Sequence, residues 1–581
     1  MFNVSPSLQK VLKYAKAYKF RFYAVGVWAI LLSVFAALRP YLLKNTVDFY
    51  ISTKDGSGLL NYVLLMVFVL ILEVSAQFYF SYWANLLGQN IIRDIRNNLF
   101  NHITSFKIKY FDKEPVGKLI TRTVSDIESI ASIFSQGLYM ILSDILKMIV
   151  ILGFMFYMNW KLTFIVIAAM PILIIATDIF QKKMKVAFNE VRNEVANLNT
   201  FIQERITGIK IVQLFNRENI EHKKFIEINQ RHNKAWLKNI LYNSIFFPIA
   251  DIVSSLTLGA VVWYGGLNII NGSALTTFGD LFAYTLLISM LFNPLRQIAD
   301  KFNVMQMGII AADRVFEILE TKSNIQDKGK INAHHLKGNI NFKNVFFSYI
   351  KNTPVLKGVS FSVKQGEKIA IIGSTGAGKS TIINLINRFY EIDNGEICID
   401  NTPIQDYTLK SLRNQISVVL QDVFLFSDTI FNNITLYNPD IKKDEVIDIA
   451  KKIGIHNFIM SLPNNYDFNV KERGIMLSSG QRQLIAFLRA YVSNPSILIL
   501  DEATSSVDTY TEELIQNATN AITKNRTSII IAHRLATIIS ADRILVMDNG
   551  NIVEEGTHNQ LLSINNGHYK NLYEAQFLSA E

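Results

Sequence analysis

The sequence predicts two architectures in one chain, an α-helical domain that spans a membrane six times and a soluble α/β domain after it. The first half of the 581 residues contains six apolar runs long enough to cross a bilayer. The second half has ordinary charge density and alternates strand-like with helix-like segments. A glycine-rich run, Gly373 to Ser380, lies between one such strand and a helix expected over Ser380–Tyr390. The length alone argues against a single domain.

Each apolar run reaches the roughly 20 residues that a helix needs to cross the hydrocarbon layer. The runs lie near residues 22–43, 59–83, 130–158, 162–180, 242–270 and 278–297. The segments after the second and fourth runs, 84–129 and 181–241, are long and basic, whereas the other connections are short and nearly uncharged. By the positive-inside rule, the N-terminus, both long segments and the soluble half face the cytosol. We expect an integral protein of a bacterial inner membrane.

The formal net charge of +10 is compatible with a nucleic-acid partner or with an anionic membrane surface. Much of the basic excess lies beside the apolar runs, which favours the membrane and predicts no nucleic-acid partner. The chain contains one cysteine, Cys398, so no intrachain disulfide framework exists.

Several ionisable residues interrupt the apolar runs and have two interpretations: Arg39, Glu73, Asp144, Lys147, Asp251 and Asp280. They could line a polar substrate cavity, because charged residues within spans usually face one. Alternatively, Asp144 and Lys147 are three residues apart and could neutralise each other. Arg39 and Asp280 could reach the membrane surface, and Asp251 could lie near the cytosolic interface. Glu73 lacks an obvious local partner, which makes it the preferred cavity residue.

The glycine-rich run matches the phosphate-binding pattern G-x-x-x-x-G-K-[ST]. Its residues are Gly373, Ser374, Thr375, Gly376, Ala377, Gly378, Lys379 and Ser380. The glycines allow backbone N–H groups to turn toward phosphate oxygens, Lys379 adds a positive charge, and Ser380 can hold Mg²⁺. The preceding apolar strand and the following helix supply the context that this motif requires.

Acidic residues follow a second buried strand. Ile497–Leu500 ends in Asp501 and Glu502. In phosphate-loop ATPases such a strand brings one carboxylate toward Mg²⁺ and another toward the attacking water. The alternative is an ordinary helix N-terminus that bears acids. A third strand, Ser528–Ala532, ends in His533.

The segment Leu477-Ser478-Ser479-Gly480-Gln481 lies between the phosphate loop and the acidic strand. With these motifs, the chain resembles the ATP-binding cassette (ABC) exporters over essentially its whole length. The family signature is L-S-G-G-Q, so Ser479 stands where glycine is usual. The resemblance implies a transmembrane domain over 1–322, a linker over 323–337 and an ATP-binding cassette over 338–581.

The resemblance also implies two ATP sites, each shared between the phosphate loop of one protomer and the signature of the other. The implied nucleotide contacts are Tyr349, the run Gly373–Ser380, Thr381, Asp508 and, from the opposite protomer, Ser478, Ser479, Gly480 and Gln481. Mg²⁺ is assigned to Ser380, Gln421 and Asp501. Catalysis is assigned to Glu502, which activates water, to His533, which senses the γ-phosphate, and to Lys379 and Gln421. Asp508 would communicate between the two sites.

Other motifs correspond to surfaces that meet the membrane domain. Glu472 resembles the glutamate that faces this domain, although Lys471 replaces a usual glycine before it. The stretch from Phe111–Gly117 through Arg122 and Asp126 resembles the first cytosolic loop that docks on a cassette, and the stretch from Glu204–Gly208 through Arg217 resembles the second, which docks on the partner's cassette. A solvated charged surface is the alternative for each loop.

These features predict ATP-driven export of an amphiphilic or hydrophobic substrate, a drug or a lipid, by alternating access. The second copy of the chain is the favoured partner, with a heterodimer as the alternative. Two other functions remain open at this stage. One is a soluble-type ATPase acting on nucleic acid, which the six spans disfavour, and the other is an ATP-gated channel on the same fold.

Overall fold

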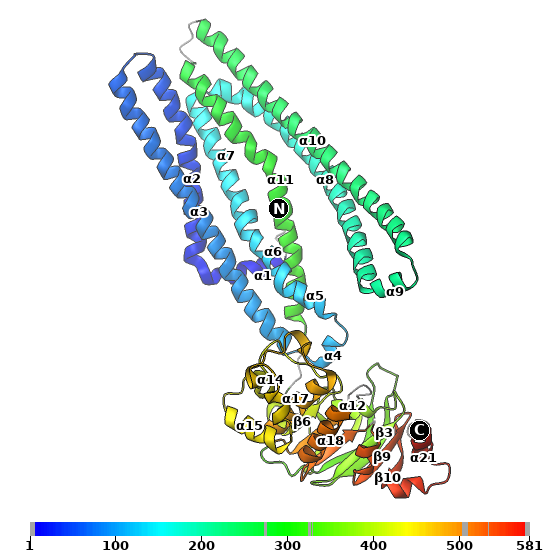
Figure 1. Cartoon of the computed structure of the whole chain (residues 1–581). Helices are drawn as coiled ribbons and strands as arrows, with labels where there is room; N and C mark the ends of the chain where they lie inside the picture. The colour runs from blue at the N-terminus through cyan, green and yellow to red at the C-terminus, as the bar shows by residue number, and fades with distance from the viewer. Residues whose placement is uncertain are drawn as a thin grey trace. The chain divides into compact units, whose positions relative to one another are not determined.

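The computed structural model describes residues 6–271, 276–322, 327, 329–501, 509–532 and 534–575. The chain divides into two compact units (Figure 1). Unit 1 comprises Met1–Ser105 and Glu114–Lys322, and unit 2 comprises Phe106–Lys113 and Ser323–Glu581. The two units are described separately.

All regular secondary structure in the described residues of unit 1 is helical. Its elements are α1 (Pro6–Ala15), η1 (Lys16–Tyr18), α2 (Lys19–Asn45), η2 (Thr46–Ile51), α3 (Gly56–Thr104), α5 (Val116–Thr121), η3 (Arg122–Asp126), α6 (Ile127–Ser132), η4 (Ile133–Leu138), α7 (Tyr139–Met158), α8 (Trp160–Thr207), α9 (Ile209–Leu214), α10 (Glu218–Ile270) and α11 (Phe278–Glu320). They include six helical stretches that are long and apolar enough to cross a membrane, which confirms the predicted spans. The helices extend well beyond the apolar runs, as expected for the long basic segments.

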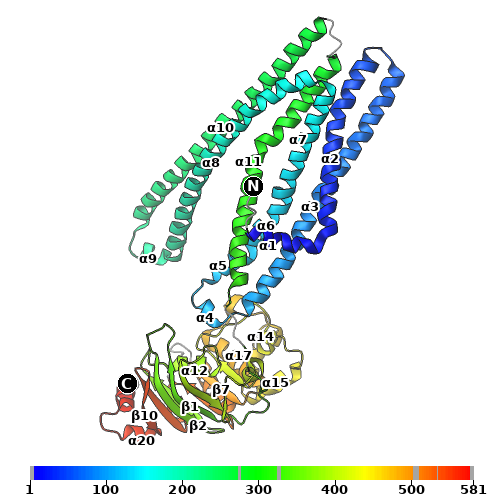
Figure 2. The same ribbon diagram turned by 180° about the vertical axis from the view of Figure 1, so that it is seen from behind.

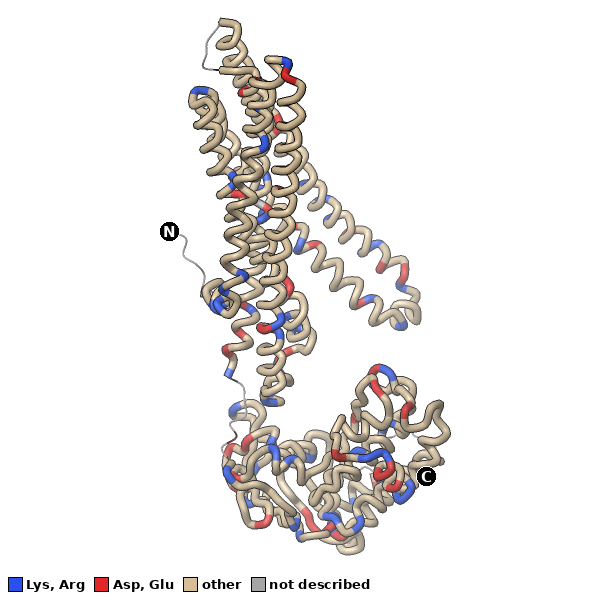
Figure 3. The backbone as a smooth tube through the Cα atoms, turned by 90° about the vertical axis from the view of Figure 1, so that its left-hand side faces the viewer, with Lys and Arg blue, Asp and Glu red and all other residues tan. Residues whose placement is uncertain are grey.

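The helices of unit 1 pack in neighbouring pairs. Helices α2 and α3 lie side by side, as do α8 and α10, which the short helix α9 joins at one end (Figures 1 and 2). Charged residues are sparse along much of these helices and more frequent toward α9 (Figure 3). One apolar core joins α7, α8, α10 and α11 to Ala37 of α2, and it includes Met155, Leu162, Leu287 and Phe292. This core therefore packs the later helices of unit 1 against the first span.

The ionisable residues within the spans have partners that the sequence spacing did not indicate. Asp144 pairs with Lys301 of α11 and not with Lys147, so the expected neutralisation within one helix is wrong. Glu73 lies 3.6 Å from the guanidinium of Arg39 on the neighbouring helix, so it does have a partner. The reason is geometric, because helices that pack side by side bring together charges that are distant in sequence.

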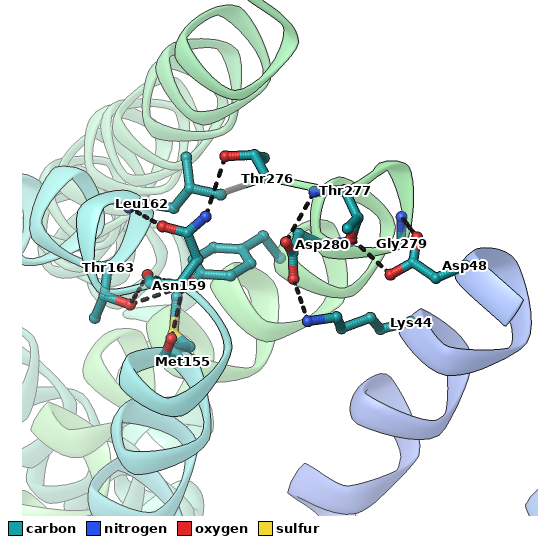
Figure 4. A network of polar contacts seen from close by, with 11 residues as sticks. Lys44, Asp48, Met155, Asn159, Leu162, Thr163, Thr276, Thr277, Gly279 and Asp280 are labelled. Atoms are coloured by element: carbon teal, nitrogen blue, oxygen red, sulfur yellow. Dashed lines mark hydrogen bonds and ion pairs between the residues drawn. The ribbon is translucent and has the colours of Figure 1, made fainter. Parts of the chain in front are cut away.

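Two further pairs join helices in the same way. Asp251 accepts a hydrogen bond of 2.5 Å from Arg296, and Asp280 forms an ion pair of 2.8 Å with Lys44 (Figure 4).

Unit 2 mixes strands and helices. Its strands are β1 (Ile340–Phe347), β2 (Leu356–Val363), β3 (Lys368–Gly373), β4 (Asn394–Ile399), β5 (Thr402–Pro403), β6 (Ile416–Val419), β7 (Ile497–Asp501), β8 (Thr527–Ile531), β9 (Arg543–Asp548) and β10 (Asn551–Gly556). Its helices are α4 (Ile108–Phe111), α12 (Lys379–Ile386), α13 (Leu409–Asn414), α14 (Ile430–Thr435), α15 (Lys443–Lys452), α16 (His456–Met460), η5 (Asn465–Asp467), η6 (Glu472–Gly474), α17 (Ser479–Val492), α18 (Thr509–Thr523), α19 (Leu535–Ile539), α20 (His558–Leu562) and α21 (His568–Tyr573). These elements agree with the predicted α/β class.

Two sheets organise unit 2. The six-stranded sheet has the order β10-β9-β3-β8-β7-β6 and is parallel except for β10, and the four-stranded antiparallel sheet has the order β2-β1-β4-β5. Strand β3 is buried on both faces, since Ala370 and Ile372 belong to one apolar core and Ile369 and Ile371 to the other. Such a strand holds the loop at its carboxyl end in a fixed position.

Helix α12 is shorter than predicted. It ends at Ile386, and Arg388 adopts a left-handed φ of 51° beyond the helix. The buried Arg388 side chain bonds Glu391 and the Tyr407 carbonyl, and these contacts hold the reversed backbone in place.

Candidate nucleotide-binding site

The loop from Gly373 to Gly378 has a backbone that its glycines make possible. Gly373, Gly376 and Gly378 adopt φ values of 152°, 86° and 105°, a region that favours glycine. A Cβ on Gly373 would lie 2.2 Å from the Met547 carbonyl oxygen, whereas a Cβ on Gly376 would meet nothing within 4 Å. The loop is therefore tight against β9 on one side and open at Gly376, where the backbone can approach a phosphate.

Lys379 begins α12 and turns back over this loop. Its Nζ donates to the carbonyl oxygens of Gly373 at 2.8 Å and Ser374 at 2.9 Å. The side chain is buried, and burial lowers the pKa of Lys379 while the charge of Asp501 opposes that shift. A buried ammonium that is bonded only to neutral carbonyls is suited to an anionic ligand such as a nucleotide phosphate.

Tyr349 is fixed to the same helix. Its hydroxyl donates to Thr381 Oγ1 at 3.3 Å and accepts from Asn384 Nδ2 at 3.0 Å. Its ring makes edge contacts with Phe347 and Tyr390, at centroid distances of 4.8 and 5.0 Å. The structure therefore brings Tyr349 beside α12, as stacking on a base held near the phosphate loop requires.

Sheet topology brings the candidate Mg²⁺ residues to one edge. Strands β3, β6 and β7 belong to one parallel array, so the phosphate loop, Gln421 and Asp501 all follow carboxyl ends at the same edge. Gln421 is exposed just beyond β6, and Ser380 is exposed on the first turn of α12. Hydroxyl, amide and carboxylate oxygens are ligands that Mg²⁺ accepts, so this donor set fits the ion.

Asp501 lies in a desolvated position at the end of β7. Burial raises the pKa of Asp501, the charge of Lys379 lowers it and Asp422 raises it further. The net direction is upward, so the ionised carboxylate is less stable here than in water. A bound cation would reverse that penalty.

The signature segment forms the N-terminus of α17. Ser478 Oγ accepts from the Gln481 N–H at 3.2 Å, and Gln481 Oε1 accepts from the Ser478 N–H at 3.0 Å, which is a capping box. Ser479 is the first residue of the helix and has no positive φ. The replacement of the usual glycine is therefore compatible with this backbone.

The other departure from the family pattern, Lys471, does lie at a position whose backbone favours glycine. Lys471 adopts φ 60° and ψ −174°, a conformation in which glycine is normally found, and its N–H donates to Asn469 Oδ1 at 2.9 Å. The loop before Glu472 thus keeps a glycine-like shape despite the lysine.

Three predicted site residues lie outside the described residues: Glu502, Asp508 and His533. The strands that precede these residues end where the sequence predicted, β7 at Asp501 and β8 close to the expected end, at Ile531. The two strands are parallel neighbours in the sheet. The roles of these three residues stay predictions.

The sequence did not identify Tyr390 as an interaction residue. Its hydroxyl donates to the Asp112 carboxylate, in the segment Phe106–Lys113 that belongs to unit 2. Burial and this hydrogen bond raise the pKa of Tyr390. The only sequence signal was a tyrosine after the phosphate-loop helix, and it is the fold that brings this tyrosine to Asp112.

Two family models match the chain. The model for the ABC transporter transmembrane region matches residues 22–295, and the model described as ABC transporter matches residues 356–505. The chain therefore belongs to the ABC transporter family, and it combines a membrane region with one ATP-binding domain. As a member of this family it couples ATP hydrolysis to transport.

Named relatives match nearly the whole chain. It is 35% identical to the putative multidrug export ATP-binding/permease protein YgaD of Bacillus subtilis, over 98% of this chain and 100% of that protein. It is 33% identical to an ATP-dependent lipid A-core flippase of Syntrophus aciditrophicus, over 98% and 94% of the two chains. An uncharacterized ABC transporter ATP-binding protein of B. subtilis, YknV, is 35% identical over 98% and 94%.

Proposed function

We propose that two copies of this chain form a homodimer with two composite ATP sites and export an amphiphilic drug or lipid by alternating access. The observation that carries the proposal is that one chain holds both halves of a site, the phosphate loop on β3–α12 and the capped signature on α17. Two copies therefore supply both halves twice. The names of the relatives, multidrug export and lipid A-core flippase, support the substrate class.

Each assigned residue has a limited task in this function. Tyr349 stacks on the base, and Lys379 and the loop N–H groups orient the phosphates. Ser380, Gln421 and Asp501 would hold Mg²⁺, which would neutralise phosphate charge. Glu502 orients the attacking water. The ATP-bound form must favour the closed cassette pair, because a ligand shifts an equilibrium only through different affinities for its two states.

The first test replaces Glu502 with Gln. We expect Glu502→Gln to bind MgATP with near-normal affinity, to lose nearly all phosphate release and to remain as a closed dimer. Exposed Glu513 on the following helix supplies the matched control, since Glu513→Gln makes the same chemical change on α18. Near-normal turnover in purified Glu502→Gln protein would remove its assigned role.

The second test concerns assembly and substrate. Light scattering of the purified chain in nanodiscs should give the mass of two copies, and a one-copy mass would contradict the homodimer. ATPase stimulation across a panel of lipids, lipophilic dyes and peptides then identifies the substrate class. Accumulation of the stimulating compound against its gradient in sealed vesicles separates a pump from an ATP-gated channel.

A further inference from the structure

Four positive charges lie where the chain enters the first span. Lys13 is in α1, Lys16 is in η1, and Lys19 and Arg21 are in the first turn of α2. No Asp or Glu precedes Asp48 in the sequence, so residues 1–47 contain no negative side chain. We call Lys13, Lys16, Lys19 and Arg21 the basic corner.

The charges of the basic corner are uncompensated. Lys13, Lys16 and Lys19 are exposed, and none of them pairs with a carboxylate in the part of the chain that the structure describes. The guanidinium of Arg21 lies over the Tyr18 ring, 5.6 Å from its centroid, and its Nη1 is buried with no hydrogen-bond partner among the described residues. Unmatched cations in one place fit an anionic partner.

Contacts with two other helices hold the basic corner in place. The Tyr18 hydroxyl donates to Asp94 of α3 at 2.6 Å and accepts from Arg93 at 3.1 Å. Helix α1 lies crosswise to α2 (Figures 1 and 2), and one of its faces is buried. Its Tyr14 ring lies 6.3 Å from the ring of Phe316 in α11. The lysines therefore project from a fixed backbone and not from a free tail.

Aromatic side chains adjoin the basic corner. Phe20 and Tyr23 are 78% and 70% exposed. The Phe20 ring packs edge-on against Trp83 of α3, with 6.1 Å between the centroids. Further ring contacts continue along α3 from Trp83 through Tyr82 to Phe78. Aromatic residues of this kind are typical of the boundary between lipid headgroups and hydrocarbon.

The length of α2 places the basic corner at the same boundary. The 27 residues of this helix, Lys19–Asn45, extend over about 40 Å, which exceeds the roughly 30 Å hydrocarbon core and approaches the thickness with headgroups. The basic corner lies at the end of α2 that the positive-inside rule assigns to the cytosol. A partner at this level meets cations and exposed rings together.

We propose that the basic corner binds the phosphate headgroup of anionic phospholipids in the cytosolic leaflet. The lysines attract the phosphate, and Phe20 and Tyr23 contact the glycerol and the upper acyl chains. A nucleic acid or an acidic protein would match the charges but would leave the two rings without an apolar partner, which favours the lipid. The lipid is a bound ligand and not the transported substrate, so this inference goes beyond the proposed function.

Quenching of tryptophan fluorescence by brominated lipids tests this in the full-length protein in vesicles. Trp83 is kept, and the other four tryptophans are replaced by Phe: Trp28, Trp160, Trp236 and Trp263. Brominated phosphatidylglycerol is compared with brominated phosphatidylcholine at equal mole fractions. A lysine near an anionic surface favours binding by about fivefold. The association constant at Trp83 should therefore be about tenfold or more higher for the anionic lipid, and added salt should reduce this preference.

Three triple variants show whether the basic corner causes the preference. Lys13→Gln/Lys16→Gln/Lys19→Gln should bring the ratio of the two association constants to within about twofold of one. Arg at the same three positions keeps the charge and should keep the preference. The matched control removes three exposed lysines from α8 and α10 and should leave the ratio unchanged: Lys185→Gln/Lys223→Gln/Lys234→Gln.

The outcomes decide between a lipid and other partners. Equal quenching by the two lipids in the parent, or an unchanged preference in the Gln variant of the basic corner, would overturn the lipid site. Equal quenching together with heparin binding that this variant loses would assign the basic corner to a soluble polyanion and would also overturn it. If size exclusion shows that the triple variant fails to fold, Lys16→Gln alone decides, with an expected loss of preference of about threefold or more. No loss in Lys16→Gln would contradict the proposal.

Discussion

Lys379 and Lys44 are both largely buried lysines at helix ends, yet their surroundings differ. Lys379 bonds only neutral carbonyl oxygens of its own loop, with the carboxyl of Asp501 acting at longer range. Lys44 pairs at 2.8 Å with the carboxylate of Asp280. The first charge is available to an incoming anion, whereas the second is already matched within the fold. Local compensation of charge therefore distinguishes Lys379, the predicted phosphate-binding lysine, from Lys44, which joins two helices.

The backbone departs from regular geometry in both regions. The cassette contains left-handed conformations at the loop glycines and at Lys471. Beside Lys44, η2 is a π-helix and Lys54 adopts a left-handed φ of 57°. The difference between the two regions therefore lies in how their charges are matched and not in their backbone.

Replacement of Lys379 gives the largest expected effect. Lys379→Ala should lower ATPase activity by about 100-fold or more, because it removes the buried positive charge that we propose binds the phosphates. Phosphate release in nanodiscs measures this, with Lys351→Ala as an exposed control. Retained activity in Lys379→Ala would contradict the comparison between the two lysines, because the uncompensated charge of Lys379 would then not be needed to bind the nucleotide.

Asp501→Asn should lower ATPase activity but raise the stability of the nucleotide-free protein. We expect ATPase activity to fall about 10- to 100-fold through weaker Mg²⁺ positioning. Stability without nucleotide should rise near neutral pH. The pKa of Asp501 is raised above its ordinary 3.8, so ionisation is less favourable in the folded chain than in the unfolded one.

The raised pKa of Asp501 determines how this difference in stability depends on pH. The stability advantage of Asp501→Asn should be absent below pH 3.8, grow as the pH rises through the raised pKa and then level off. Thermal unfolding of both proteins across this range measures the difference. If the wild-type protein were more stable than Asp501→Asn near neutral pH, the positive charge of Lys379 would fully offset the cost of burying the Asp501 carboxylate.

Tyr284→Phe tests the neutral block, the buried polar contacts that hold α11 to α7 and α8. The Tyr284 hydroxyl has one proton for the Met155 or the Asn159 carbonyl oxygen and also contacts Thr163 Oγ1. Both carbonyls accept backbone N–H groups as well, so its removal should lower stability by only about 0.5–1.5 kcal/mol. ATP hydrolysis by the folded fraction should be little changed. A thermal midpoint equal to that of wild type would indicate that water can enter this block, which would weaken the contrast between the matched groups of unit 1 and those of the nucleotide site.

Lys471→Gly and Ser479→Gly restore the glycines that are usual in the family, and they should change stability by small amounts in opposite directions. Lys471→Gly should stabilise the protein by about 1 kcal/mol, because glycine adopts the observed φ of 60° without strain. Ser479→Gly should destabilise it by less than about 1 kcal/mol, because glycine is less favourable at a helix start that already has helical geometry. Thermal midpoints report both. Destabilisation by Lys471→Gly would mean that the lysine side chain makes a compensating contact.

The sequence predicted the elements and motifs because these depend on local patterns. Apolar length identified the six spans, and the glycine spacing identified the loop between β3 and α12. The partners of Asp144 and Glu73 could not be predicted in this way. Their true partners, Lys301 and Arg39, lie on other helices, and helix packing has no short-range signature. The contact of Tyr390 with Asp112 escaped prediction for the same reason.

By itself, the sequence determined that the chain crosses a membrane and carries a phosphate-binding loop, because hydrophobic length and glycine conformation are properties of consecutive residues. Only the tertiary structure decided which charges are matched and which remain available. The ion pair of Lys44 with Asp280 joins residues far apart in the chain, and such a pair forms only once packing has brought α2 and α11 side by side.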